Sequence, residues 1–153
     1  ILTEIERDDA VERLVLTGTD NVFASGADLR EIASLTENDA RSFARRGQTL
    51  MDRIANLEVA TTAGINGYCL GGALDLAPAC RARIASQNAT FCHPGTGLGI
   101  ITGWGGTQRL PRLIGEANAL EMLFTASPIS ASEALRIGLS DTIADDLFLS
   151  PES

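Results

Sequence analysis

Residues 64–80 read GINGYCLGGALDLAPAC, and this stretch decides how the rest of the chain is interpreted. It contains four glycines and one carboxylate, Asp75, among residues that are almost all small or apolar. The Asn-Gly pair at 66–67 predicts a turn that tolerates a positive φ. The glycine pair at 71–72 then opens a short apolar helix, which we predict to extend from Gly71 to Cys80. A lone acid three residues after a glycine pair is the feature that needs a functional explanation.

Predicted strands and helices alternate on both sides of this stretch. Short apolar runs bounded by turn-forming residues predict strands at 13–18, 59–65, 83–85 and 90–92. Amphipathic segments predict helices at 36–55, 116–125 and 131–137. Thr36 and Ser130 are the expected N-caps of the first and last of these helices, and Gly138 is the expected C-cap of the last. The alternation predicts an α/β protein.

The composition indicates one globular domain that does not bind nucleic acid. A length of 153 residues fits a single domain, 1–153, with no length left for a second. Hydrophobic residues make up 44% of the chain and charged residues 21%, which is typical of a protein with a packed core. The formal net charge is −8 and lysine is absent, so no basic face is expected. A phosphorylated small molecule is still allowed, because backbone N–H groups and a few arginines can hold one.

The cysteines and the apolar runs point to a cytoplasmic protein. Cys69, Cys80 and Cys92 are odd in number and form no Cys-x-x-Cys pair, so we expect buried, reduced thiols and no metal site. A nucleophilic cysteine would need a nearby base, and His93 is the only histidine. The apolar runs are too short for a signal peptide or a membrane span, so no membrane partner is expected.

Two loops share a physical character that suits a backbone binding site. Residues 24–28 (ASGAD) and 70–73 (LGGA) each follow a strand or turn, consist mainly of small residues and lead towards a helix. Helix starts leave N–H groups unpaired, and two such groups aimed at one point stabilise a developing oxyanion. Spacing alone favours the simpler interpretation that Gly71 and Gly72 permit close helix–strand packing, because glycine motifs are weak evidence without context.

Four motifs in order along the chain resemble the crotonase superfamily, the enoyl-CoA hydratases and isomerases. They are VFASGADL (22–29), GINGYCLGGALDLAPACRARIAS (64–86), GLGIITGWGGTQRLPRLIG (97–115) and ALEMLFTASPISASEALRIGL (119–139). The resemblance implies a crotonase-type ββα spiral core that assembles as homotrimers or dimers of trimers. It also implies that the family's N-terminal hairpin and C-terminal helices are missing from this chain, so that the core domain is truncated at both ends.

The same resemblance implies a site for acyl-CoA thioesters and overturns the packing interpretation of the two loops. Coenzyme A enters as part of the substrate, so no separate cofactor is implied. The implied oxyanion donors are the backbone N–H groups of Ala27 and Gly72, which would polarise the thioester carbonyl and stabilise an enolate. The implied path of the CoA adenine and pantetheine is lined by Ser25 and by the loop Ala27, Asp28, Leu29 and Arg30.

The two acids of the family's hydratases are altered in this chain. Asp75 stands at the position of the first glutamate and Gly95 at that of the second. A misplacement of about 1 Å costs on the order of a hundredfold in rate, and a lost acid–base group costs about 10²–10⁴-fold. An efficient ordinary hydratase is therefore not expected. Asp75 is either the remaining acid, with a pKa raised by burial, or a polar helix residue.

Three further residues carry open interpretations. His93 is either an alternative acid–base group with a pKa suited to neutral pH or a hydrogen-bonded structural residue at a strand end. Trp104 stands where the family often has a small residue, and it either shapes the acyl pocket or covers a subunit contact. Thr102 replaces a proline common in the family, which predicts a looser loop.

These observations leave three functional hypotheses. The first is an enoyl-CoA hydratase or isomerase that uses a backbone oxyanion hole. The second is a crotonase-fold enzyme with other enolate chemistry, an isomerase or a decarboxylase, in which one acid or none is sufficient. The third is a non-catalytic acyl-CoA-binding or assembly subunit, which the glycine at position 95 favours.

Overall fold

Eight strands form two four-stranded sheets in the computed structural model, which describes residues 1–145 and 147. The first sheet has the order β1 (Arg13–Thr17), β3 (Ala60–Ile65), β5 (Ala82–Ala85) and β8 (Thr142–Ile143), and all its pairs are parallel. The second has the order β2 (Val22–Ala24), β4 (Tyr68–Leu70), β6 (Thr90–Cys92) and β7 (Ile129–Ser130). Only its last pair, β6 with β7, is antiparallel.

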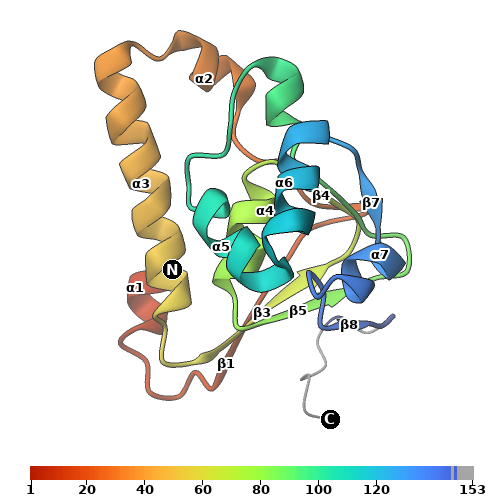
Figure 1. Cartoon of the computed structure of the whole chain (residues 1–153). Helices are drawn as coiled ribbons and strands as arrows, with labels where there is room; N and C mark the ends of the chain where they lie inside the picture. The colour runs from red at the N-terminus through yellow and green to blue at the C-terminus, as the bar shows by residue number, and fades with distance from the viewer. Residues whose placement is uncertain (146, 148–153) are drawn as a thin grey trace.

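The chain winds as a spiral, because the first six strands alternate between the two sheets. β1 and β2, β3 and β4, and β5 and β6 each contribute one strand to each sheet before the chain turns into helical structure. Figure 1 shows the strands β1, β3 and β5 of successive turns side by side, with α3 at the left of the molecule and α7 at the right. This arrangement confirms the expected α/β class and the ββα spiral.

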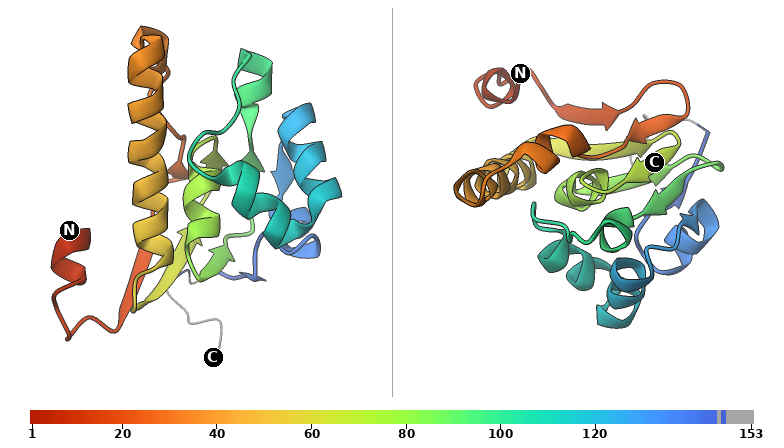
Figure 2. Two further views of the ribbon diagram at one scale, coloured as in Figure 1. Left: turned by 60° about the vertical axis from the view of Figure 1, so that its left-hand side comes forward. Right: turned by 90° about the horizontal axis from the view of Figure 1, so that it is seen from above.

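Seven α-helices and two 3₁₀ segments connect the strands in the described part of the chain. They are α1 (Leu2–Ile5), α2 (Leu29–Ser34), α3 (Glu37–Ala55), α4 (Ala73–Leu76), η1 (Ala77–Ala79), η2 (Pro94–Leu98), α5 (Gly106–Ile114), α6 (Glu116–Thr125) and α7 (Ala131–Arg136). Figure 2 shows that α3 stands along one side of the molecule and that α4 lies between α3 and α5. Among the described residues, no helix is both long and apolar enough to cross a membrane.

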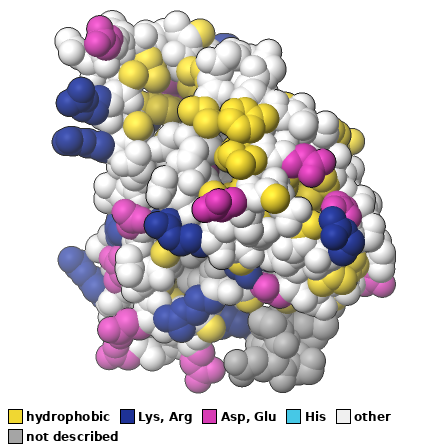
Figure 3. Space-filling view, in the orientation of Figure 1, with side chains coloured by type: hydrophobic (Ala, Val, Ile, Leu, Met, Phe, Trp, Pro, Cys, Tyr) yellow, Lys and Arg dark blue, Asp and Glu magenta, His cyan; other side chains and the backbone are white. Residues whose placement is uncertain are grey.

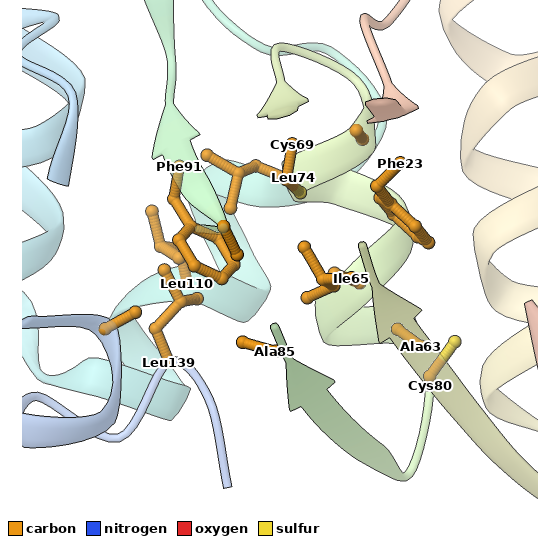
Figure 4. Packing of buried hydrophobic residues seen from close by; sticks show 14 of the residues in the cluster. Phe23, Ala63, Ile65, Cys69, Leu74, Cys80, Ala85, Phe91, Leu110 and Leu139 are labelled. Atoms are coloured by element: carbon orange, nitrogen blue, oxygen red, sulfur yellow. The ribbon is translucent and has the colours of Figure 1, made fainter. Parts of the chain in front are cut away.

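The core forms around the residues of the decisive stretch. Ile65 of β3, Cys69 of β4 and Leu74 of α4 are completely buried, and they meet Phe91 of β6 and Leu110 of α5 in one apolar cluster (Figure 4). Burial of large apolar side chains from four turns of the chain is the main term that holds these turns together. Both ends of the glycine pair are thereby fixed, the strand before it and the helix after it.

The sequence predicted the longer elements and missed the shorter ones. The predicted helices and strands are confirmed, and the hydroxyls of Thr36 and Ser130 accept the N–H of Asp39 and Glu133 as N-caps. The strands β2, β4, β7 and β8 and the helices α2 and α5 were not predicted. The helix predicted to extend to Cys80 ends as α-helix at Leu76 and continues as the 3₁₀ segment η1.

Candidate active site

The two glycine loops are in direct backbone contact. Gly26 has φ +91° and Gly71 has φ +57°, which L side chains rarely adopt. A Cβ added to Gly26 would lie 2.7 Å from the backbone nitrogen of Gly72, so only glycine allows this approach. The N–H of Gly71 donates to the carbonyl of Cys92 at 2.9 Å and ties the second loop to β6.

The expected oxyanion donors lie at this contact. Ala27 follows Gly26, and Gly72 is the N-cap residue of α4. Within the described residues, neither the backbone N–H of Ala27 nor that of Gly72 is paired with a protein acceptor. Unpaired backbone donors away from bulk water are costly, and they are commonly satisfied by a ligand. Two free donors on touching loops form a suitable site for a single acceptor oxygen.

An apolar cavity of about 280 Å³ adjoins these two loops. Exposed hydrophobic side chains at its mouth include Leu29, Leu98 and Ile101. The space-filling view in Figure 3 shows hydrophobic side chains gathered on the upper part of one face, with charged side chains more frequent below. The cavity brings together eight of the residues predicted for the site: Ser25, Ala27, Leu29, Gly72, Asp75, His93, Gly95 and Trp104.

Two predicted residues do not reach the cavity. The segment after Ala27 is not an open loop, because α2 begins at Leu29. Asp28 is the N-cap of this helix, and its carboxylate accepts hydrogen bonds from the backbone and the guanidinium of Arg30. The Arg30 neighbour holds the pKa of the Asp28 carboxyl below its usual value. Both side chains point to the exposed face of the helix start, where Arg30 is 93% exposed.

A larger hollow, of about 990 Å³, is lined by residues of α1, the following loop and α3. Its walls carry several carboxylates and two arginines: Glu6, Asp8, Asp9, Glu12, Asp52, Glu58, Arg53 and Arg81. This excess of negative charge would repel a phosphorylated ligand. The smaller apolar cavity, with its free N–H groups, is therefore the better candidate.

Asp75 is buried and fully engaged by one loop. Its side chain is 1% exposed, and the hydroxyl of Thr102 donates to both carboxylate oxygens. The backbone N–H groups of Trp104 and Gly106 donate to the same carboxylate, which therefore caps the N-terminus of α5. Burial raises the pKa of the carboxyl, as expected, and the Thr102 hydrogen bond opposes the increase. The prediction of a looser loop was wrong, because Thr102 is the residue that ties the loop to Asp75.

Gly95 lines the cavity without contributing an acid. A Cβ at this position would lie 2.8 Å from the carbonyl oxygen of Ile100. The backbone N–H of Ile100 in turn donates to the carbonyl of Gly95 at 2.9 Å. A larger side chain would therefore require the backbone near Ile100 to move. In the described part of the chain, Asp75 is the only carboxylate that lines this cavity.

His93 is a neutral residue in the cavity wall. It is 4% exposed, and its Nε2 atom is buried without a hydrogen-bond partner within the described residues. Burial lowers the pKa of the imidazole to about 4. The predicted pKa near neutrality was therefore wrong. The other interpretation, a hydrogen-bonded structural histidine, is wrong for the Nε2 atom, because this atom has no hydrogen-bond partner among the described residues.

The cysteines play no part in the cavity. All three are free and buried, as predicted, and burial raises the pKa of each thiol, that of Cys80 to about 12. The Cys92 thiol donates to the carbonyl of Ala126 at 3.1 Å. Within residues 1–145 and 147, no group of three or more His, Cys, Asp or Glu side chains is placed to hold a metal ion.

Sequence reasoning missed the apolar wall that α3 provides. Phe43 and Ala44 line the cavity, and Gly47 lies on the same helix against the Trp104 indole. A glycine in the interior of a 19-residue helix was the available signal, because glycine costs about 1 kcal/mol relative to alanine there. Such a residue is retained where a neighbour needs the space.

Comparisons with known proteins show the family of this chain. The profile of the enoyl-CoA hydratase/isomerase family matches residues 1–150. The crotonyl-CoA hydratase of Syntrophomonas wolfei is 44% identical over 152 residues, which are 99% of this chain and 58% of that protein. A probable enoyl-CoA hydratase of Bacillus subtilis is 44% identical over 146 residues, 95% of this chain and 57% of that protein.

A solved structure has the same fold over most of this chain. The crystal structure of the enoyl-CoA hydratase of Bacillus anthracis superimposes with a TM-score of 0.88 and 40% identity, over 94% of this chain and 56% of that one. The chain thus spans slightly more than half the length of each of these three proteins. The fold, the touching glycine loops and the family match lead to one conclusion: the chain belongs to the crotonase superfamily, in the enoyl-CoA hydratase/isomerase family.

Proposed function

We propose that this chain binds an acyl-CoA thioester and stabilises its enolate between the N–H groups of Ala27 and Gly72. The observation that carries the proposal is the pair of unpaired N–H groups on two touching loops beside an apolar cavity. The thioester oxygen would accept both hydrogen bonds, and the acyl chain would occupy the cavity. Two donors preorganised at the oxygen stabilise the negative charge that develops there when the α-carbon loses a proton or a carboxylate group.

Hydration of the enoyl group is the first candidate reaction. Its rate is limited because the cavity offers too few acid–base groups. A hydratase must deliver water to the β-carbon and a proton to the α-carbon. Among the residues that the structure describes, Asp75 is the only carboxylate at the cavity, and it already accepts hydrogen bonds from Thr102, Trp104 and Gly106. Loss of one acid–base partner at Gly95 costs about 10²–10⁴-fold. We therefore expect hydration to be slow.

A second candidate is an enolate reaction that needs fewer acids, an isomerisation or a decarboxylation. The observation that favours it is the glycine at position 95, where a Cβ would lie 2.8 Å from the Ile100 carbonyl oxygen, so that a second acid would require the backbone there to move. Decarboxylation of a 2-carboxyacyl thioester releases CO₂ and leaves the electron pair on the enolate, so it needs no base. If the chain binds the thioester but catalyses neither hydration, isomerisation nor decarboxylation, it is a non-catalytic acyl-CoA-binding subunit.

The proposed oxyanion site is tested by infrared difference spectroscopy with a ¹³C-labelled thioester. Two hydrogen bonds to the carbonyl would lower its stretching frequency on binding. Butanoyl-CoA is a suitable probe because it resembles the substrate and does not react. Gly97→Ala is a control variant that should give the same shift as the unaltered chain, since a Cβ at Gly97 would meet no described atom within 4 Å. Failure of the ester to bind, or binding with an unshifted carbonyl, would overturn the proposal.

The reaction is tested by following crotonyl-CoA hydration in the full chain and in the Asp75→Ala variant. Turnover above that of the variant supports hydration. Product analysis by mass spectrometry with enoyl-CoA and malonyl-CoA esters separates hydration, isomerisation and decarboxylation. Assembly into trimers or dimers of trimers, which the resemblance implies, is checked by analytical ultracentrifugation.

A further inference from the structure

The Trp104 side chain is enclosed between two glycines from different elements. A Cβ added to Gly47 of α3 would overlap the five-membered ring of the indole. A Cβ added to Gly72 would lie 2.6 Å from Cζ3 at the edge of the six-membered ring. The indole therefore extends from the face of α3 to the start of α4. The ring of Phe43 lies beside it, with centroids 5.4 Å apart and planes at 40°.

The backbone that carries Trp104 is fixed from three directions. Gln48 of α3 donates to the carbonyl of Gly103 at 2.8 Å, and Arg109 of α5 donates to the carbonyl of Trp104 at 3.3 Å. The Trp104 N–H donates to Asp75. Contacts at both ends of the ring system and hydrogen bonds to the backbone around it make the indole a rigid wall.

This wall separates two hollows. On one side lies the apolar cavity of about 280 Å³ that contains the free N–H groups. On the other lies a polar groove of about 580 Å³, whose walls include Gln48, Arg109 and Arg112. Trp104 lines both hollows. Thr102 and Gly103 line both as well, so the loop at 102–104 lies between the two hollows.

We propose that Trp104 limits the length of the acyl group that this site accepts. The inference rests on the proposed function, because it places the thioester oxygen at the N–H of Gly72. The edge of the indole lies against Gly72, so an acyl chain that leaves this point towards α3 meets the ring within its first carbons. A short acyl group fits in front of the indole, and a long one does not. The substrate class is a short-chain acyl-CoA thioester.

The proposal is tested by measuring dissociation constants of butanoyl-CoA and octanoyl-CoA by calorimetry with the full chain. Burial of each methylene group improves affinity about fourfold. Octanoyl-CoA has four more methylene groups than butanoyl-CoA, so its affinity should rise strongly if the cavity has space for them. We expect Trp104→Ala to raise the preference for octanoyl-CoA over butanoyl-CoA at least tenfold. Gly103→Ala is the matched control, because Gly103 lines the same cavity and a Cβ there would contact only Ala44, at 3.8 Å.

The possible results separate this inference from the proposed function. If both esters bind and the preference changes less than twofold in Trp104→Ala, the inference is overturned and the proposed function stands. If neither ester binds to the unaltered chain, both are overturned. If Gly103→Ala changes the preference as strongly as Trp104→Ala, the effect does not belong to the indole and the inference fails.

A thermodynamic cycle tests the wall without relying on a ligand. Gly47 does not line the cavity, and alanine is the better helix former at that position. Gly47→Ala should lower the melting temperature of the unaltered chain, because the new methyl group overlaps the indole. In the Trp104→Ala background the same substitution should leave the melting temperature unchanged or raise it. An equal decrease in both backgrounds would show that the indole is not held there.

Discussion

Asp75 holds together the loop that forms one wall of the site. Three donors from residues 102–106 converge on its carboxylate, and all of them lose their acceptor when the side chain is removed. A buried donor without a partner costs about 1–3 kcal/mol. We expect Asp75→Ala to reduce the free energy of unfolding by about 2–4 kcal/mol on this basis, measured by urea denaturation.

Thr102→Val is the matched variant for this prediction. It removes one donor but keeps the carboxylate and its two backbone partners, so the loss should be about 1 kcal/mol. If Asp75→Ala unfolds with the same free energy as the unaltered chain, the carboxylate does not anchor the loop. Lower turnover in a variant of unchanged stability would instead assign Asp75 to proton transfer.

His93 should make the protein less stable in mild acid. Burial depresses the imidazole pKa from 6.5 in the unfolded chain to about 4 in the folded chain. Between these values the unfolded chain binds more protons, so the free energy of unfolding decreases as the pH falls from about 6.5 to 4. The full effect is on the order of 3 kcal/mol, because one pKa unit corresponds to about 1.4 kcal/mol.

The measurement for His93 is urea denaturation at several pH values, for the unaltered chain and for His93→Gln. The difference between the two proteins cancels the carboxyl groups that titrate in the same range, including Asp75, whose raised pKa acts in the opposite direction. His93 is the only histidine in the chain. Parallel stability curves for the two proteins between pH 6.5 and 4 would contradict the shifted pKa.

The limits of sequence reasoning are clear at these two residues. The burial of Asp75 was predictable, because it lies among small apolar residues in a short helix. Its partners were not, since Thr102 is 27 residues away and reaches Asp75 only through the folded position of α5. The pKa of His93 was mispredicted because its burial, which lowers the pKa, could not be read from the sequence.

At the scale of elements, α3 depends on a cap at its N-terminus. The Thr36 hydroxyl accepts the N–H of Asp39 at 3.3 Å and also donates to the Asp39 carboxylate. Loss of such a cap costs about 0.5–2 kcal/mol. Thr36→Ala should therefore reduce the free energy of unfolding by about 1 kcal/mol, and Thr36→Ser, which keeps the hydroxyl, should not. Equal values for these two variants would show that the cap does not contribute to stability.

Long periodic elements were predictable and short ones were not. The helix at 37–55 has enough turns for its apolar face to be recognised. β2 and β4 have three residues each, too few for any period to show. α5 contains Pro111 and begins at a glycine, so propensity argued against it, and its N-terminus is capped by Asp75 from another element. Tertiary contacts override local preference in such elements.

At the scale of the whole molecule, the spiral explains why the two glycine loops meet. β2 and β4 are parallel neighbours, so their carboxyl ends lie at the same edge of the sheet. The loop with Gly26 follows β2, and the loop with Gly71 follows β4. The candidate oxyanion site is thus a product of strand order. Small residues and helix starts marked both loops in the sequence, but only the resemblance placed them together at one site, because neither strand was recognised.

The last strand of the first sheet is held by an ion pair with a buried arginine and a partly exposed aspartate, which gives a prediction for the whole fold. The guanidinium of Arg83 in β5 is 7% exposed and donates to both oxygens of Asp141, at 2.7 Å each. Asp141 directly precedes β8, and its side chain also accepts the backbone N–H of Arg83. Removing one partner of a buried pair costs about 3–5 kcal/mol, because the other charge stays buried without compensation.

We expect Asp141→Ala to reduce the free energy of unfolding by about 3 kcal/mol, the lower end of this range, because the Asp141 side chain is about one-third exposed. Glu31→Ala is the control. It breaks the exposed Arg46–Glu31 pair between α2 and α3, and such pairs contribute at most about 1 kcal/mol. The double variant Arg83→Met/Asp141→Ala also removes the Arg83 charge that Asp141→Ala leaves buried without a partner. It should therefore be more stable than Asp141→Ala alone. If Asp141→Ala loses no more stability than Glu31→Ala in urea denaturation, β8 is held by the sheet hydrogen bonds and not by the ion pair.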